Sequence, residues 1–402
     1  MNHRRSVLKA GFAGALAAPA LAQAQQTFSW KMTSAYGKGS PFYMDGPGSA
    51  TDLAKRIDAM SGGRLKIQVF GAGELVPAFE GFDAVRAGTV EMNHANSYFW
   101  TGKTAAAQYF TAVPFGMNFQ GMNGWFYDGG GLELWNEVYA PFGMIALPCG
   151  NTGVQMTGWF KKEITSVADL KGLKMRIPGL AGKVYASLGV DVKVLPGGEI
   201  FPALERGVID AAEFVGPFQD RRLGLHKAAK FYHTTGWHEP ATVSELLINK
   251  AAWMKLPKDL QAIVENASAA CNVISEAWCQ KHNSEAMEDL IKNQKVIARP
   301  LPDAVIKALR DETEKVLAEV GEPTDIGLFT EVRRAKVRLL VKRATGAMEE
   351  KRDAKRVILK TQYGEVESKR VALATNAFPP LLKRLSLYMV PVYDYVLMTE
   401  PL

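Results

Sequence analysis

Strand-like and helix-like segments alternate from Phe28 onward, and this alternation limits the fold more than any other feature of the sequence. A strand is expected over residues 28–36 and a helix over 51–60, whose apolar side chains recur on one face. A second strand follows over 65–69, where apolar and polar residues alternate, and a second helix over 79–86. This strand–helix–strand order predicts an α/β domain.

A second region of the same kind starts near the middle of the chain. Strands are expected over residues 173–177 and 190–195, with a short helix over 201–206. We therefore expect one α/β lobe over residues 25–150 and a second over 151–250.

Long helical patterns fill the next part of the chain. One extends over residues 253–292, and another over 303–320, where Pro302 precedes the first helical residue and Gly321 follows the last. We expect residues 251–324 to pack as helices on both lobes, leaving a ligand cleft between the lobes.

Length and charge narrow the class of protein. The chain has 402 residues, which is typical of two domains, and a formal net charge of +7. Residues 25–324 carry 30 basic and 32 acidic side chains, so the positive excess lies in residues 1–24 and 325–402. The central part lacks the charge that phosphate binding requires, and we expect no nucleic-acid partner. No apolar run reaches the roughly 18–20 residues of a membrane-spanning helix.

Residues 1–24 have the features of an export signal. Two arginines precede an apolar stretch rich in Ala and Gly, and Ala22-Gln23-Ala24 supplies a small-x-small cleavage pattern. The paired arginines resemble a twin-arginine signal, and an ordinary secretory signal is the alternative. Both predict a periplasmic protein whose mature chain starts near Gln25.

Three stretches carry a family resemblance. Residues 166–179 read SVADLKGLKMRIPG, residues 195–213 read LPGGEIFPALERGVIDAAE, and residues 150–156 read GNTGVQM. The first two resemble the extracytoplasmic solute receptors of tripartite ATP-independent periplasmic (TRAP) transporters, and the third resembles their 2-oxo acid and lactate branch. The similarity covers about residues 28–320.

The resemblance implies a fold, a function and a partner. The fold is the α/β, two-lobed periplasmic-binding-protein fold, with the ligand cleft between the lobes and long C-terminal helices. The function is that of a receptor, not an enzyme, which captures a small 2-oxo or 2-hydroxy monocarboxylate and delivers it to membrane permease subunits. Two alternatives stay open: a same-fold receptor for a sugar acid or a dicarboxylate, and a flavin-dependent oxidase.

Arg176 is the expected carboxylate-binding residue. Its side chain leaves the strand on the face opposite Met175 and Ile177, just before a Pro-Gly pair. A guanidinium keeps its charge and presents a planar fork that matches a carboxylate. By resemblance, this arginine holds the substrate carboxylate.

The same resemblance implies a cation beside the substrate. In this branch the side chains of Gln155, Glu213 and Glu239 and the backbone carbonyl of Phe214 hold the ion, and Gln155 also lies at the substrate. Two carboxylates, an amide oxygen and a main-chain oxygen suit sodium or calcium, and this set has no imidazole to favour zinc. We expect one of these two ions and leave open which.

Three further residues are expected at the substrate. Tyr98 and Phe99 would form the wall of the other lobe, with Tyr98 hydrogen-bonded to the ligand, and Asn151 would offer its amide. Aromatic core packing and a turn are the alternative roles. His233 and His238 lie five apart without a third ligand in suitable spacing, and we expect no zinc site there.

Residues 325–402 differ from the rest of the chain. They are basic, and residues 364–378 and 390–401 resemble an internal piece of flavin-dependent amine or amino-acid oxidases, without the G-x-G-x-x-G turn that seats the flavin. We interpret this segment as the remnant of a fusion or gene rearrangement. In the 2-oxo acid branch a helix that swaps between protomers occupies this place, so a homodimer is in doubt.

Overall fold

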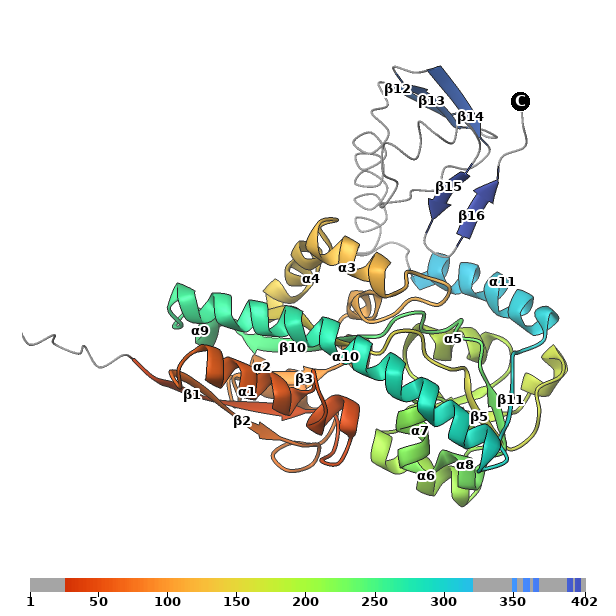
Figure 1. Cartoon of the computed structure of the whole chain (residues 1–402), viewed down its shortest axis with the longest axis horizontal. Coiled ribbons are helices and arrows are strands. Elements are labelled where there is room, and N and C mark those ends of the chain that lie inside the picture. Colours follow the sequence, from red (N-terminus) through yellow and green to blue (C-terminus); the bar gives the residue numbers. More distant parts are fainter. Residues whose placement is uncertain are drawn as a thin grey trace, which may run out of the picture.

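The computed structural model describes residues 26–320, together with the backbone of five strands between residues 349 and 398. The expected export signal over 1–24 therefore lies outside the described residues, as does most of the oxidase-like segment over 325–402. Within residues 26–320, two mixed sheets are flanked by helices (Figure 1). This arrangement confirms the expected α/β class.

The first sheet has the strand order β2-β1-β3-β10-β4. Strand β1 runs parallel to β2 and β3, whereas β10 is antiparallel to β3 and β4. Along β1, Trp30 and Met32 are buried and Lys31 is exposed, but the final residues Thr33 and Ser34 are both buried. The carboxyl end of β1 is thus enclosed on both faces. The strands are β1 (Phe28–Ser34), β2 (Leu65–Phe70), β3 (Met92–Ala95), β4 (Met144–Asn151) and β10 (Val243–Asn249).

Helices cover this first sheet. Helix α1 begins after Ser49, whose hydroxyl accepts a hydrogen bond from the backbone amide of Asp52, and it buries Leu53 and Ile57. Helices α1 and α2 confirm the two helices expected from the sequence, with starts within two residues. The helices and short turns of this part are η1 (Pro41–Asp45), α1 (Ala50–Met60), α2 (Gly81–Arg86), η2 (Ser97–Trp100), η3 (Ala105–Phe110), α3 (Phe119–Tyr127), α4 (Gly131–Tyr139) and η4 (Ala140–Phe142).

The second sheet has the strand order β11-β9-β5-β8-β6-β7. Strand β6 is parallel to β7 and β8, and β5 is antiparallel to β8 and β9. Gly158 has a φ of 124° and lets β5 approach β8, because a Cβ there would lie 2.5 Å from the carbonyl oxygen of Ala212. The strands are β5 (Gly158–Phe160), β6 (Lys174–Arg176), β7 (Asp191–Lys193), β8 (Ala211–Ala212), β9 (Phe231–His233) and β11 (Ile297–Arg299). The helices are η5 (Val167–Leu170), α5 (Gly179–Ser187), α6 (Gly197–Glu205), α7 (Pro217–Leu223) and α8 (Leu225–Ala228).

Two extended crossings join the sheets. Residues 152–157 lead from β4 to β5, and residues 234–242 lead from β9 back to β10. The return differs from the expected lobe boundaries, because residues 243–249 were assigned to the second lobe and instead form β10 inside the first sheet. A continuous apolar strand reads the same in either sheet, so its pattern could not reveal which sheet it joins.

A 35-residue helix, α10 (Lys258–Lys292), is the third connection. At 1.5 Å per residue it is about 52 Å long, and it packs on β4 and α1 of the first part and on α7 of the second (Figure 1). Pro257 separates it from α9 (Lys250–Trp253), which divides the single helix expected over 253–292. Helix α11 (Asp303–Val320) has the expected bounds and packs on α5.

The described strands near the C-terminus pair only with one another. Strands β12 (Glu349–Arg352), β13 (Val357–Thr361) and β14 (Gly364–Ser368) form an antiparallel sheet, and β15 (Met389–Val392) and β16 (Tyr395–Met398) an antiparallel pair. Among the described residues, no helix is both long and apolar enough to span a bilayer.

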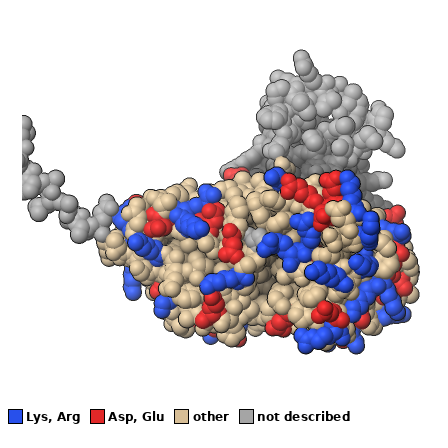
Figure 2. Space-filling view, turned by 60° about the horizontal axis from the view of Figure 1, so that its bottom comes forward, with Lys and Arg blue, Asp and Glu red and all other residues tan. Residues whose placement is uncertain are grey.

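Charges of both signs cover the face shown in Figure 2. Lys and Arg side chains are denser over the half that contains the second sheet, with Asp and Glu side chains among them. This face therefore carries no patch of a single charge sign.

Candidate functional site

Polar side chains from the second sheet and from both crossings meet inside the molecule. Arg176 is the last residue of β6, and Glu213 directly follows β8. Gln155 lies in the first crossing and Glu239 in the second. All four residues are at most 3% exposed. Groups of this polarity remain buried only where partners or a ligand compensate their lost hydration.

The two crossings are hydrogen-bonded side by side. The backbone amide of Thr152 donates to the carbonyl of Thr242, and that of Gln155 donates to the carbonyl of Glu239, both at 3.1 Å. These bonds hold the backbone of Gln155 next to that of Glu239. Gln155 lies in the crossing that leads to the second sheet, and Glu239 lies in the crossing that leads back to the first.

The carbonyl oxygen of the Gln155 side chain is a buried acceptor without a donor. Its Nε2 donates to the hydroxyl oxygens of Thr152, at 3.2 Å, and Thr242, at 2.8 Å. Both hydroxyl protons are already used, since Thr152 donates to the carbonyl of Gly153 and Thr242 to the carboxylate of Glu239. The amide nitrogen must therefore face the two threonines, which leaves Oε1 unsatisfied.

Arg176 and Glu213 form a buried ion pair. Nη1 of Arg176 donates to Oε2 of Glu213 at 2.9 Å and to its backbone carbonyl at 2.6 Å, while Nε donates to the carbonyl of Leu195 at 3.2 Å. The other carboxylate oxygen of Glu213, Oε1, has no hydrogen-bond partner. Among the described residues Nη2 donates no hydrogen bond, so one corner of the guanidinium is available to an anion.

Glu213 and Glu239 are two buried carboxylates, and ionising both is unfavourable unless a positive charge lies near them. Burial raises the pKa of Glu213 to about 8, although Arg176 partly offsets this effect. Burial also raises the pKa of Glu239 to about 7, and the charge of Glu213 adds to that rise. A cation between them stabilises both ionised forms. The oxygens of Gln155 and Glu213 that have no hydrogen-bond partner are a neutral and an anionic donor of the kind that sodium and calcium accept.

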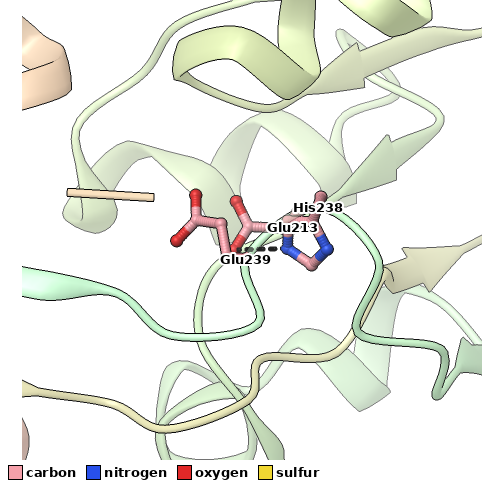
Figure 3. Close-up of side chains that lie close together, drawn as sticks. All are labelled: Glu213, His238 and Glu239. Carbon is pink, nitrogen blue, oxygen red and sulfur yellow. Dashed lines mark ion pairs between the residues drawn. The ribbon is translucent and has the colours of Figure 1, made fainter. Parts of the chain in front are cut away.

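A histidine that is not in the expected donor set lies beside it. His238 lies in the same cluster, and one ligand atom each from Glu213, His238 and Glu239 lie within 4.8 Å of one another (Figure 3). Burial lowers the pKa of His238 to about 4, so its ring is neutral near pH 7. His233 is elsewhere, where its Nε2 accepts a hydrogen bond from the backbone amide of Ile164. Sequence spacing did not reveal this position of His238, because Glu213 lies far from it in the sequence and directly follows β8.

Tyr98 and Phe99 lie in η2, directly after β3. Tyr98 is buried, and this burial raises its phenol pKa, with smaller contributions from the charges of Glu239 and Glu213. Phe99 is half-buried, and its ring lies 4.6 Å from that of Phe79, centroid to centroid. Phe79 lines the cavity described below, whereas Phe99 packs behind it.

Asn151 is the last residue of β4, and only one end of its side-chain amide is hydrogen-bonded. Its Oδ1 accepts a hydrogen bond from the backbone amide of Gly153 at 2.8 Å, as the turn interpretation expects. Its Nδ2 is buried without a partner. Phe214 follows Glu213 and places its ring 5.8 Å from the guanidinium of Arg176.

A cavity of about 640 Å³ opens between the two halves of the molecule. Segments 35–40 and 77–80 line it from the first half, and residues 196–199 and Phe214 from the second. Tyr36 at its wall stacks on Tyr43 and donates a hydrogen bond to Asn96. Sequence reasoning missed these groups, although Tyr36 and Asn96 follow the parallel strands β1 and β3, whose carboxyl ends meet at one edge.

Two sheets joined by crossings, with a cavity between them and a buried Arg–Glu pair beside orphaned oxygens, define a solute-binding receptor for small anions. A family model described as bacterial extracellular solute-binding protein, family 7 (DctP), matches residues 47–323, and the chain belongs to this family. These proteins are the periplasmic receptors of TRAP transporters and work with membrane permease subunits.

Several relatives are close. The monocarboxylate 2-oxoacid-binding periplasmic protein of Nostoc sp. is 50% identical over 262 residues, which cover 65% of this chain and 71% of that protein. Crystal structures of TRAP periplasmic solute binding proteins from Pseudoalteromonas atlantica, with sodium and pyruvate, and from Colwellia psychrerythraea, with calcium and pyruvate, are each 39% identical with a TM-score of 0.74. They cover 79% of this chain and 97% and 98% of their own chains.

Proposed function

We propose that this receptor captures a small 2-oxo or 2-hydroxy monocarboxylate together with a bound cation and delivers it to the TRAP permease subunits. In this proposal Arg176 binds the carboxylate of the ligand. Gln155, Glu213, Glu239 and the carbonyl of Phe214 hold the cation, and Tyr98, Phe99 and Asn151 complete the ligand site.

The observation that carries the proposal is the set of unsatisfied polar atoms around the Arg176–Glu213 pair. Oε1 of Gln155 and Oε1 of Glu213 are buried acceptors without donors, while Nη2 of Arg176 is a donor without an acceptor among the described residues. A ligand carboxylate satisfies the donor, and a cation satisfies the acceptors. A neutral solute would leave both kinds of group unpaired.

Charge balance favours a divalent ion over sodium. Arg176 contributes one positive charge, and ionised Glu213 and Glu239 contribute two negative charges, to which a monocarboxylate adds a third. A divalent ion neutralises the remainder, whereas sodium leaves one uncompensated negative charge in a buried site. The relatives with pyruvate hold either sodium or calcium, so both ions belong in the test.

The cavity bears on the length of the ligand. Its volume of about 640 Å³ exceeds the space needed by a three-carbon acid, and Phe214 joins its wall to the guanidinium of Arg176. A longer 2-oxo acid could extend its side chain into this space. This feature also keeps the alternative open that the ligand is a sugar acid or a dicarboxylate.

Titration calorimetry of the purified chain tests the proposal. Pyruvate, longer 2-oxo acids, 2-hydroxy acids and dicarboxylates are compared in calcium, in sodium and in chelator. We expect 2-oxo or 2-hydroxy monocarboxylates to bind most tightly, and binding to weaken when the ion is removed. Preference for a dicarboxylate or a sugar acid, or binding that ignores the ion, would contradict the proposal.

The proposal also covers the two ends of the chain. We propose that residues 1–24 direct export by the twin-arginine route and that residues 325–402 are the remnant of a fusion or gene rearrangement. N-terminal sequencing of the exported protein should begin near Gln25. A purified protein without flavin absorbance is expected, whereas a yellow protein would favour the oxidase alternative. Analytical ultracentrifugation decides between monomer and homodimer.

A further inference from the structure

Asp220, in the first turn of α7, is a buried carboxylate that accepts four hydrogen bonds. Its Oδ1 accepts from the backbone amides of Val215, at 3.1 Å, and Gly216, at 3.2 Å. Its Oδ2 accepts from Nε1 of Trp159 in β5, at 3.0 Å, and from the hydroxyl of Tyr232 in β9, at 2.8 Å. The residue is 1% exposed, so these four donors replace its lost hydration.

Stabilisation of the start of α7 explains only half of this arrangement. An acidic side chain in the first turn of a helix is stabilised by the free backbone amides there, and Oδ1 has this role. Oδ2 instead binds two strands of the second sheet, where the rings of Trp159 and Tyr232 stack at 4.0 Å, centroid to centroid. Asp220 therefore ties the backbone amides of Val215 and Gly216 to β5 and β9.

The segment held in this way contains the carbonyl that we propose as a cation ligand. The carbonyl of Glu213 accepts a hydrogen bond from Nη1 of Arg176. The carbonyl of Val215 accepts one from the backbone amide of Met156 at 3.1 Å. No hydrogen bond among the described residues reaches the carbonyl of Phe214 between them. The bonds of its neighbours therefore fix where this carbonyl lies.

We propose that Asp220 is a positioning residue of the cation site: it fastens the backbone amides of Val215 and Gly216 to the second sheet and so keeps the carbonyl of Phe214 at the ion. The inference rests on the proposed function, in which that carbonyl is a cation ligand. It adds a residue that contacts neither the ion nor the acid, since both oxygens of Asp220 are already hydrogen-bonded. Groups that orient metal ligands in this way raise ion affinity.

A single NMR signal reports both ends of this linkage. Phe214 and Val215 form the only Phe-Val pair in the sequence. A protein labelled at phenylalanine carbonyl carbons and valine amide nitrogens therefore gives one carbonyl–amide correlation signal, from this peptide bond. Its carbon frequency reports the Phe214 carbonyl, and its proton frequency reports the hydrogen bond from Val215 to Asp220. We expect calcium with pyruvate to shift the carbon signal of the unsubstituted protein downfield.

Substitution of Asp220 should change this signal and the ion affinity together. Asp220→Ala should weaken calcium binding about 10- to 100-fold, move the amide proton upfield and reduce the carbon shift at saturating calcium. Asp220→Asn keeps an acceptor oxygen for the two amides and should recover part of the affinity. Tyr232→Phe is the matched control, because it removes one hydrogen bond from the same carboxylate and leaves those to Val215 and Gly216. Its calcium affinity should stay within about threefold of the unsubstituted value.

Unchanged calcium affinity in Asp220→Ala would overturn the inference, as would an equal loss in Tyr232→Phe. If Asp220→Ala does not fold, Asp220→Asn decides. Its neutral oxygen accepts weaker hydrogen bonds, so the amide proton should move upfield and calcium affinity should fall; an upfield proton with unchanged affinity refutes the positioning role.

Pyruvate binding is measured in parallel by calorimetry. If pyruvate binds with calcium but the Asp220 variants hold calcium as the unsubstituted protein does, only this inference fails. If no acid binds while calcium alone shifts the Phe214 carbon in a manner that depends on Asp220, the proposed function fails and the positioning role stands.

Discussion

Replacement of Arg176 by Ala should weaken ligand binding and uncouple it from the cation. The guanidinium is 3% exposed and donates twice to Glu213, at 2.9 Å and 2.6 Å, so its loss leaves two buried negative groups, Glu213 and the bound carboxylate, without their positive partner. Removing one member of such a pair costs about 2–5 kcal/mol, which is about 30- to 4,000-fold in affinity. Arg176→Lys should recover only part of this loss, because a point charge does not reproduce the planar fork.

The coupling is the sharper part of this prediction. Arg176 lowers the pKa of Glu213 against the effect of burial, so Arg176→Ala should leave Glu213 more strongly protonated and less able to hold an ion. Chelation should weaken pyruvate binding markedly in the unsubstituted protein and much less in the variant, since coupling between two ligands is reciprocal. Titration calorimetry on both proteins, with and without chelator, measures all four affinities.

Arg221→Ala provides the matched control. Nη1 of Arg221 also lies 2.9 Å from a carboxylate, that of Asp289, but the two side chains are 32% and 28% exposed. Water replaces most of such an interaction, and the free energy of unfolding should change by at most about 1 kcal/mol with ligand affinity unaffected. Tight pyruvate binding by Arg176→Ala that ignores chelation would refute the reasoning, and so would an equal effect of both substitutions.

Three further outcomes are expected. Lowering the pH from 8 to 6 should weaken calcium binding, because the pKa values of Glu213 and Glu239 are raised to about 8 and about 7 and a proton then competes with the ion. Calorimetry in buffers of different ionisation enthalpy should detect the release of protons when calcium binds. Calcium binding that does not depend on pH would contradict this prediction. Gln155→Leu removes the orphaned oxygen and should reduce calcium affinity at least about tenfold, whereas an unchanged value would exclude this residue as a ligand. Asp220→Asn removes a buried carboxylate that accepts hydrogen bonds from Trp159, at 3.0 Å, and from the backbone amide of Val215, at 3.1 Å. Urea unfolding should show that the free energy of unfolding falls by about 1–3 kcal/mol. A variant as stable as the unsubstituted protein would show that these bonds contribute nothing to stability.

Local signals in the sequence were sufficient for most elements of the fold. Pro302 and Gly321 bracket α11, and the apolar spacing of Leu53 and Ile57 marked α1. Each of these signals acts within a few residues, so it survives without knowledge of the tertiary structure. The sheet to which residues 243–249 belong could not be predicted, because membership depends on the direction in which the second crossing returns.

The candidate site shows the same limit. Arg176 could be placed at the end of a strand from the sequence, but its pairing with Glu213 appears only when β6 and β8 lie side by side. His238 carried no signal because its partner Glu213 is 25 positions away in the sequence and reaches it through the fold. Distances between chemically paired groups were therefore the part that only three-dimensional structure could supply.

Rotation of one sheet relative to the other must bend the two crossings and α10, because these described segments connect the two halves. Gln155 and Glu239 lie on the bending segments themselves and are tied together across them. If these two residues hold the cation as proposed, its donors lie on the segments that rotation of the sheets would bend, so release of the ion and rotation of the sheets would be coupled. A tightly bound ion would then resist the same motion as the stiffness of α10.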